Sequence, residues 1–423
     1  MRTKPNILAF LAAAGLTIAA HAGDATARAA SGNVTTDAPG KFPDLRVPDG
    51  LGVNIHFFSG GTTNDLDQMQ AAGFRFVRED FAWSRVEQAK GVYNFKPYDD
   101  LTRELTRRGL RALYILDYGN KLYEPSGMSV QTEPGREAFA RFAAAAAARY
   151  RGQGVVWELW NEPDVLWYPY PAGAKAPRTE EYVDLAKVAL PAVRKADPGA
   201  LIIAPAVNRM KFEYLEACFK LGLLDLLDGV SVHPYRGGGP ESVAADIERL
   251  RALMAKYRPE GKPLPVISGE WGWTVLPKAG YASVSSPEQQ GHYLARQFLV
   301  NLSLGIPVSI WYDWRDDGTD PKNGEHNFGT VTHDRQPKPA YRALQKLTEA
   351  LGGMRFVKRL DAPPDEWRLL FTDGQRSAIA AWTTAQPRSA GVIPDQKVEL
   401  TEAPRYFQVP PGEARKLRER KNP

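Results

Sequence analysis

The chain has 423 residues, of which 43% are hydrophobic and 10% aromatic, enough for one large folded domain or two ordinary ones. Its formal net charge of +5 comes from 54 basic and 49 acidic residues, a balance that does not indicate a nucleic-acid-binding protein. The single cysteine, Cys218, excludes an internal disulfide and a thiolate cluster for a structural metal.

The first 22 residues have the pattern of a secretory signal peptide. Arg2 and Lys4 precede an apolar run over residues 7–20, which a small-residue cleavage site follows. This run is shorter than the roughly 20 residues that a membrane span needs. We therefore expect a signal peptide at 1–22, a linker at 23–47, and an exported mature protein, periplasmic or extracellular, that has no membrane span.

Short β-like runs then alternate with helical patterns eight times, which is typical of parallel β/α units. Strands are expected at 52–57, 74–79, 111–117, 155–161, 201–206, 229–234, 265–270 and 307–312. Helices are expected at 65–72, 98–108, 136–150, 180–195, 212–221, 241–257, 287–304 and 339–351. An open doubly wound sheet is the competing fold, but no glycine-rich phosphate turn follows the first strand. The pattern predicts an α/β fold, a (β/α)8 TIM barrel over residues 48–352.

The helical period stops at about residue 353. Shorter alternating runs follow at 355–357, 367–371, 377–382, 398–400 and 406–409, separated by turn residues. We predict a small antiparallel, β-sandwich-like domain over 353–413 and a solvated basic tail over 414–423. Carbohydrate binding and a purely structural role both remain open for this domain.

Two glutamates follow the apolar parts of the fourth and seventh predicted strands. Glu162 lies in WELWNEP, residues 157–163, and Glu270 lies in ISGEW, residues 267–271. Catalytic residues of (β/α)8 barrels lie at the carboxyl ends of the strands. Hydrolysis of a glycosidic bond needs two carboxyls, one to protonate the leaving oxygen and one to stabilise or capture the sugar carbon. The pair therefore predicts a glycoside hydrolase.

Polar or aromatic residues end most of the other predicted strands. They are His56, Arg78 and Asp80, Asp117 and Tyr118, His233 and Tyr235, and Trp311 and Asp313. A single one could be a buried group with satisfied hydrogen bonds. A ring of them around one face of the barrel favours a binding site.

Further motifs accompany the two glutamates. They are Arg78, Trp83 to Val86, Gly91 to Phe95, Asn161-Glu162-Pro163, His233-Pro234-Tyr235 and Trp311. In these motifs the chain resembles the retaining glycosidases of clan A over residues 47–351, most of all family 39 and its bacterial exopolysaccharide-associated endoglycosidase relatives. The resemblance implies that Glu162 is the acid/base and Glu270 the nucleophile of a retaining reaction. It also implies that Asn161 holds the sugar 2-hydroxyl and that Tyr235 or His233 orients Glu270.

The chemistry of these roles leads to further expectations about the residues at the barrel mouth. A general acid must hold its proton, so we expect the apolar barrel mouth to raise the pKa of Glu162. Glu270 must stay ionised, and Arg78 could supply the positive charge beside it. Strict alternation would put Asn161 and Glu162 on opposite faces, so the strand must end or bulge there. Glu158 lies deeper, and we expect it to be a buried, paired carboxylate.

Nine side chains are expected to bind substrate. They are His56, Arg78, Trp83, Tyr118, Asn161, His233, Tyr235, Trp271 and Trp311. Aromatic residues at 167–171, Trp273 and Trp314 add flat apolar faces for sugar rings. This abundance favours an extended cleft and endo action, although a blocked pocket with exo action stays open. No metal or cofactor is expected, because the histidines form no His-x-x-x-His pair.

The favoured function is a secreted, retaining endo-glycoside hydrolase that cleaves a β-linked polysaccharide, with bacterial exopolysaccharide as one candidate. The alternatives are an exo-acting, β-xylosidase-like glycosidase of the same clan and a non-catalytic glycan-binding barrel. The expected partner is a polysaccharide or oligosaccharide and not a nucleic acid. Protein partners are left open by the sequence.

Overall fold

The computed structural model describes residues 40–124, 129–165, 179–258, 260–261, 263–276, 282–393 and 396–419. Four predicted features lie wholly or partly outside these ranges: the signal peptide at 1–22, the linker as far as residue 39, the aromatic segment at 167–171 and the end of the basic tail at 420–423.

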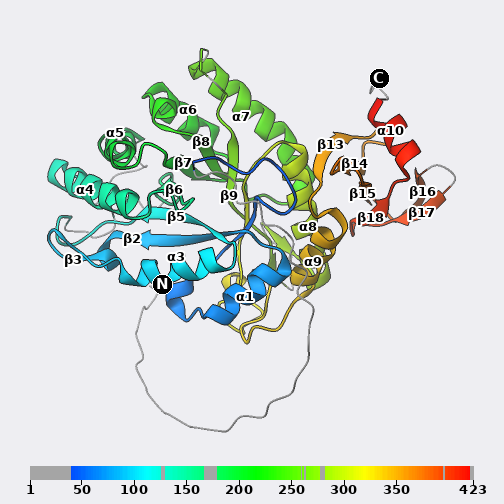
Figure 1. The fold of residues 1–423 in the computed structure, drawn as a ribbon, viewed down its shortest axis with the longest axis horizontal. Helices are drawn as coiled ribbons and strands as arrows, with labels where there is room; N and C mark the ends of the chain where they lie inside the picture. Colours follow the sequence, from blue (N-terminus) through cyan, green and yellow to red (C-terminus); the bar gives the residue numbers. More distant parts are fainter. Residues whose placement is uncertain are drawn as a thin grey trace, which may run out of the picture. The chain divides into compact units, whose positions relative to one another are not determined.

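A closed barrel of parallel strands forms the centre of the fold (Figure 1). Its strands are β1 (Leu51–Asn54), β2 (Phe76–Ala82), β5 (Arg111–Asp117), β6 (Val156–Leu159), β7 (Leu201–Asn208), β8 (Gly229–His233), β9 (Val266–Trp271) and β12 (Ser309–Trp311). They pair in chain order, and β12 returns to pair with β1. The predicted (β/α)8 barrel is confirmed, with each predicted strand overlapping one of these.

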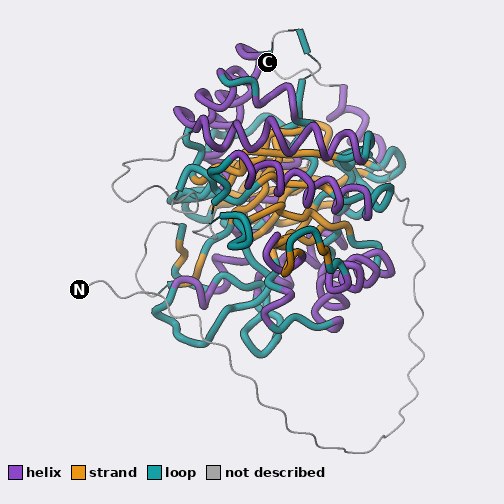
Figure 2. Tube along the Cα trace, turned by 90° about the vertical axis from the view of Figure 1, so that its left-hand side faces the viewer, coloured by secondary structure: helices purple, strands orange, loops and turns teal. Residues whose placement is uncertain are grey.

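Helices surround the barrel strands, as the view in Figure 2 shows. They are α1 (Thr63–Ala72), α3 (Lys96–Arg107), α4 (Glu133–Arg149), α5 (Thr179–Ala196), α6 (Phe212–Lys220), α7 (Val243–Tyr257), α8 (Pro287–Ser303) and α9 (Pro339–Leu351). Local sequence sets where several begin: the side chains of Thr62, Thr132 and Ser286 cap α1, α4 and α8 by accepting a backbone N–H. No helix within the described ranges is long and apolar enough to cross a membrane.

Shorter elements lie in the loops between these strands and helices. They are η1 (Phe57–Ser59), α2 (Trp83–Val86), β3 (Glu87–Ala89), β4 (Val92–Tyr93), η2 (Leu223–Leu226), η3 (Pro240–Ser242), β10 (Thr274–Val275), β11 (Ser283–Val284) and η4 (Gly324–Asn327). Of these, η4 carries a residue that lines the functional site, and α2 begins at Trp83.

The amino-terminal end of the barrel is filled by apolar side chains. They are Phe76, Leu113, Ile115, Val156, Leu201, Ile203, Ile267, Val308 and Ile310. Phe42 packs against this cluster, and a Cβ placed on Gly229 at the start of β8 would lie 3.3 Å from the Phe42 ring. Val47 is fully buried. The last residues of the predicted linker therefore belong to the folded barrel.

A smaller antiparallel sheet follows the barrel, as the sequence predicted. It contains β13 (Arg355–Arg359), β14 (Glu366–Thr372), β15 (Ser377–Thr383) and β18 (Arg405–Gln408), and a separate hairpin pairs β16 (Arg388–Ile393) with β17 (Gln396–Leu400). Strand β16 was not predicted. Residues 411–419 form helix α10 (Pro411–Glu419), which buries Ala414 against the sheet core. The described part of the predicted basic tail therefore begins as a helix, and its basic side chains Arg415, Lys416 and Arg418 are exposed to solvent.

Side-chain contacts join this sheet to the barrel helices. Trp382 Nε1 donates to Glu241 Oε1 at 2.7 Å, and Arg296 of α8 holds Glu241 at 2.6 and 2.7 Å. The Trp382 ring stacks on Trp367 with centroids 5.5 Å apart. Both rings are buried. This aromatic pair therefore packs inside the protein, which supports a structural role for the sheet.

Candidate active site

A cavity of about 560 Å³ lies at the carboxyl ends of the barrel strands, a volume typical of small-molecule sites. Its lining residues are Asn54, His56, Arg78, Asp80, Tyr118, Asn161, Glu162, Asn208, Arg209, Tyr235, Glu270, Ala282, Tyr312, Glu325 and Phe328. Seven predicted site residues are among them: His56, Arg78, Tyr118, Asn161, Glu162, Tyr235 and Glu270. The structure thus brings both glutamates to one cavity.

The backbone after β6 turns Asn161 and Glu162 to the same side. The strand ends at Leu159, and both Trp160 (φ 67°) and Glu162 (φ 46°) adopt a left-handed conformation. Such conformations cost non-glycine residues about 1–3 kcal/mol each and are found mostly at functional sites. The predicted break in strand alternation is therefore present, and it places both side chains in the cavity.

Glu162 is held by two side chains from neighbouring strands. Its Oε1 accepts a hydrogen bond from Asn208 Nδ2 at 2.8 Å and lies 2.9 Å from His233 Nδ1. The other ring nitrogen, His233 Nε2, lies 3.3 Å from Arg78 Nη2, which can only donate. These partners assign the proton to Nδ1, so that His233 donates to Glu162.

These hydrogen bonds determine the acidity of Glu162. Burial raises the pKa of its carboxyl, but the hydrogen bonds from His233 and Asn208 lower the pKa by more, and it lies below its usual value. The expectation of a raised pKa is therefore wrong, because the sequence showed the apolar neighbours of Glu162 and not its two hydrogen-bond donors.

Glu270 is held by Tyr235 and Arg78. Tyr235 OH donates to Glu270 Oε1 at 2.8 Å, and Arg78 Nη1 donates to Oε2 at 2.7 Å. Of the two residues predicted to orient Glu270, Tyr235 makes this contact, whereas His233 is fully buried, does not line the cavity and binds Glu162 instead. The prediction that His233 contacts substrate is corrected to a positioning role.

A β-bulge aims Glu270 into the cavity. Between the pairs Ser309–Ser268 and Trp311–Trp271, β12 advances two residues and β9 advances three. The extra residue reverses the alternation of side chains in β9. Glu270 therefore faces the cavity, and Trp271 packs into the layer between strands and helices.

Arg78 connects most of the polar groups under the cavity. The side chain is 1% exposed, and its guanidinium donates to Glu158, Asn54, Glu270 and Asn161 at 2.7 to 2.9 Å. Burial lowers the pKa of Arg78, but Glu158 and Glu270 raise it by more, and it lies above its usual value. Glu158 is fully buried, which confirms the prediction of a paired structural carboxylate.

The two cavity glutamates are close enough to act on one bond. A Glu162 oxygen, a Glu270 oxygen and a His233 nitrogen all lie within 4.8 Å of one another. Retaining glycosidases place their carboxyls about 5–5.5 Å apart, and inverting enzymes about 6.5–9.5 Å apart. The arrangement suits attack by one carboxylate while the other protonates the leaving oxygen.

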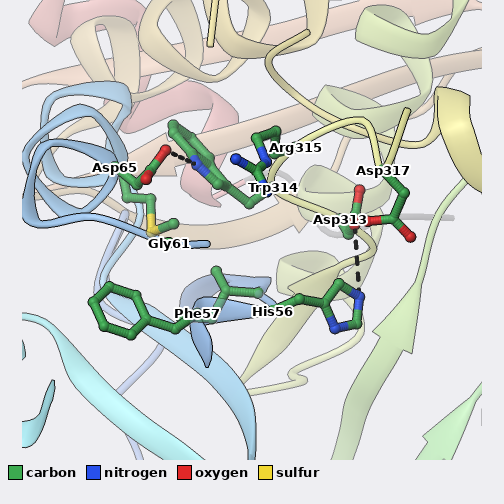
Figure 3. Close-up of a pocket in the computed structure, with 10 residues that line it drawn as sticks. His56, Phe57, Gly61, Asp65, Asp313, Trp314, Arg315 and Asp317 are labelled. Atoms are coloured by element: carbon green, nitrogen blue, oxygen red, sulfur yellow. Dashed lines mark hydrogen bonds and ion pairs between the residues drawn. The ribbon is translucent and has the colours of Figure 1, made fainter. Parts of the chain in front are cut away.

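Two clusters of described residues have ligand atoms close enough to hold a metal ion. The first is the Glu162, His233 and Glu270 group, whose contacts are accounted for by the hydrogen bonds above. The second contains His56, Asp313 and Asp317, in the segments that follow β1 and β12 (Figure 3). There His56 Nε2 lies 3.9 Å from Asp313 Oδ2, and His56 also lines the cavity.

Three tryptophans predicted to bind substrate do not line the cavity. Trp83, Trp271 and Trp311 are each fully buried. Trp83 Nε1 donates to Glu87 at 2.5 Å, and its ring stacks on Tyr123. These three predictions are wrong, because an indole near a strand end packs as well between strands and helices as it does in a binding site.

Several lining residues were not predicted. Asn208, Arg209, Tyr312, Glu325 and Phe328 all face the cavity. Asn208 lies two residues beyond the predicted fifth strand, so an extension of the strand-end rule to that strand would have found it. Glu325 lies on η4, far from any strand end, and only the folded loop brings it to Tyr312 OH at 3.4 Å.

Comparison with known proteins agrees with this geometry. The model of the cellulase family (glycosyl hydrolase family 5) matches residues 47–316, which is most of the barrel. The chain belongs to this family. It is a glycoside hydrolase of clan A. No curated protein is significantly similar to it.

Solved structures of family 39 glycoside hydrolases are also similar to this glycosidase. A family 39 glycoside hydrolase from the gut symbiont Bacteroides cellulosilyticus WH2 is 25% identical, with a TM-score of 0.73, over 86% of this chain and 81% of that one. A monomeric beta-xylosidase from Caulobacter crescentus CB15 is 18% identical, with a TM-score of 0.60, over 84% and 77%. A GH39 enzyme from Xanthomonas axonopodis pv. citri is 18% identical, with a TM-score of 0.61, over 81% and 73%. The predicted resemblance to clan A and family 39 is confirmed.

Proposed function

We propose that this glycosidase hydrolyses β-linked polysaccharide with retention of configuration, with Glu270 as nucleophile and Glu162 as acid/base. The observation that carries the proposal is the distance of less than 4.8 Å between oxygens of the two carboxyl groups. This separation leaves no room for a water molecule between the sugar and the second carboxylate, as an inverting reaction requires.

In the first step, Glu270 attacks the anomeric carbon while protonated Glu162 gives its proton to the leaving oxygen. A covalent glycosyl-enzyme and a free alcohol result. In the second step, Glu162 takes a proton from water, which attacks the anomeric carbon and releases Glu270. The hydrogen bonds from Tyr235 and Arg78 fix the orientation of the Glu270 carboxylate for attack.

We further propose that cleavage occurs within the polysaccharide chain. The support is the aromatic sequence at 167–171, which closely follows Glu162 in the chain and consists of residue types whose flat apolar faces bind sugar rings. We also propose bacterial exopolysaccharide as a candidate substrate. The signal peptide predicted at 1–22 supports this choice, because it would place the enzyme in the periplasm or outside the cell, where exopolysaccharide is found.

Exo action in the manner of a β-xylosidase is the second candidate. It is favoured by the similarity to a structure named a beta-xylosidase and by the burial of Trp271, Trp273, Trp311 and Trp314, which removes four rings from the expected sugar platform. The size of the products separates the two, since an exo enzyme releases single sugars and an endo enzyme releases oligosaccharides.

The test compares the purified mature protein with E270Q and E162Q on β-glucans, mannans, xylan and exopolysaccharide, with products read by mass spectrometry. Glu216→Gln is the matched control, because Glu216 lies on helix α6 away from the cavity. We expect oligosaccharides from the wild type and E216Q only. Glycan binding without products in the wild type would contradict the proposal and favour a non-catalytic glycan-binding barrel.

A further inference from the structure

A smaller cavity lies beside the active-site cavity, between the segments that follow β1 and β12 (Figure 3). Its volume is about 20 Å³, enough for one water molecule or one metal ion. His56 lines both cavities, whereas Asp313 and Asp317 line only the smaller one. One nitrogen of His56 and one oxygen of each aspartate lie within 4.8 Å of one another. The small cavity therefore has room for a single ion and three possible ligands in its wall.

Asp313 is a buried carboxylate that is short of partners. The residue is 1% exposed, and no described residue donates a hydrogen bond to its Oδ1. Its Oδ2 lies 3.9 Å from His56 Nε2, which is too long for a hydrogen bond. Buried charges in proteins are paired with an opposite charge or coordinate a metal. The Asp313 side chain therefore indicates a cation in the adjoining cavity.

The basic side chains near Asp313 bind other groups. Lys338 Nζ donates to Asp316 Oδ1 at 2.8 Å, and Arg315 Nη2 donates to the backbone oxygen of Ser59 at 3.3 Å. A protonated His56 would supply only one positive charge for two neighbouring carboxylates, which repel each other. A divalent cation would neutralise both.

We propose that His56, Asp313 and Asp317 bind one divalent first-row metal ion, of the class of Zn²⁺ and Mn²⁺. Imidazole suits Zn²⁺ and carboxylates suit Mn²⁺, whereas Ca²⁺ and Mg²⁺ take oxygen ligands. Zn²⁺ ligands about 2.1 Å from the metal in a tetrahedron lie about 3.4 Å apart. The His56 ring is turned toward the two carboxyl groups (Figure 3), and it and Asp317 are accessible to solvent. Small rotations of these two side chains would close the site around the ion.

The ion would join the first and last strands of the barrel. His56 follows β1, and Asp313 and Asp317 follow β12, which pairs with β1 to close the sheet. The same contact would hold the His56 ring at the wall of the active-site cavity. No metal was expected from the sequence, because these ligands come from opposite ends of the barrel domain and form no local motif. The proposal does not depend on the glycosidase reaction.

The test measures metal binding to the untagged mature protein after treatment with EDTA. Isothermal titration calorimetry with ZnCl₂, MnCl₂ and CaCl₂ would compare the wild type with His56→Ala and Asp317→Asn. We expect one Zn²⁺ per chain, with Mn²⁺ weaker and Ca²⁺ at least about tenfold weaker than Zn²⁺. Each variant should weaken Zn²⁺ binding by at least about 10²-fold, because it removes a ligand.

The matched control is Asp320→Asn. Asp320 is an exposed aspartate of the same loop, and its Oδ1 accepts the Lys322 N–H at 2.9 Å. D320N should bind Zn²⁺ as the wild type does. A Zn²⁺ concentration about 100-fold above Kd should raise Tm by about 3 °C in the wild type and D320N, and by less than about 1 °C in D317N.

Two results would overturn the site: a wild type that binds neither Zn²⁺ nor Mn²⁺, and equal Zn²⁺ affinities in the wild type, H56A and D317N. Tighter binding of Ca²⁺ than of Zn²⁺ would overturn the class of ion. Binding and Tm are measured without substrate, so a failure of this proposal is distinct from a failure of the glycosidase assignment.

Discussion

The two ends of the barrel are built from the same strands but differ in what their interiors contain. At the amino-terminal end, side chains such as Ile203 and Ile267 fill the interior and Phe42 packs against them. At the carboxyl end, the interior holds Arg78 and Glu158, a buried ion pair with a 2.7 Å contact. Apolar packing stabilises directly, whereas buried charges need exact partners to offset their desolvation. The amino-terminal end of the barrel therefore contributes mainly to stability, and the carboxyl end holds the charged groups of the active site.

Substitution of Arg78 should have the largest effect, because it removes the cation that pairs with the buried carboxylates at the carboxyl end of the barrel. Arg78→Met leaves Glu158 buried without its cation, and breaking a buried pair in this way costs about 3–5 kcal/mol. Activity should also fall at least about 10²-fold, since Glu270 and Asn161 lose a common donor. Urea unfolding and kcat/KM of the folded fraction check both effects. A stable, active R78M would show that the network does not organise the site.

A change at the apolar end should affect stability alone. Phe42→Ala removes a partly buried ring, and we expect a loss of about 2 kcal/mol in the free energy of unfolding, below the 3–5 kcal/mol typical of a fully buried phenylalanine. Below its unfolding transition, F42A should keep the wild-type kcat/KM. A fall in kcat/KM together with stability would show that the two ends are coupled.

The smallest effect is expected from a change at Asn208, which should shift the pH dependence of kcat/KM. Glu162 must be protonated to act as the acid, and hydrogen bonds from His233 and Asn208 lower its pKa, so activity should be highest in acid and fall as Glu162 loses its proton. Asn208→Ala removes one of these donors, the carboxylate is less stabilised, and the pKa of Glu162 rises. The alkaline limb of kcat/KM should therefore move to higher pH.

Tyr235→Phe is the control for this shift. It removes a donor from Glu270 and leaves the donors to Glu162 in place. Its alkaline limb should stay at the wild-type pH while kcat/KM falls by about tenfold, the value of one hydrogen bond to a charged group. Equal shifts in N208A and Y235F would show that the limb does not report Glu162.

Regular periodicity made most of the fold predictable. The eight barrel strands and their helices follow from alternating β-like runs and amphipathic segments. Strand β16 was missed because its sequence, RSAGVI, contains a serine and a glycine that weaken a strand pattern. Helix α10 was missed because the basic residues of its exposed face dominate a short segment in which Ala414 is the buried contact.

The site was less predictable where a strand departs from the regular alternation of side chains between its two faces. In β7 the register shifts between Pro205 and Val207, so that Asn208 and not Val207 reaches the cavity. In β9 a bulge turns Glu270 inward and Trp271 outward. The motif singled out Glu270, which lines the cavity, but the alternation of side chains alone gave no means of placing Asn208 or Trp271, because a bulge depends on the pairing of neighbouring strands.

The most direct test of the two-step mechanism is to trap the glycosyl-enzyme. The wild type would be incubated with a 2,4-dinitrophenyl 2-deoxy-2-fluoro-β-glycoside of the sugar found in the substrate screen, digested, and its peptides analysed by mass spectrometry. Because the fluorine slows release of the covalent intermediate, we predict a single adduct on Glu270. An adduct on Glu162, or no adduct with an enzyme that hydrolyses the parent glycoside, would contradict the assignment of Glu270 as the nucleophile.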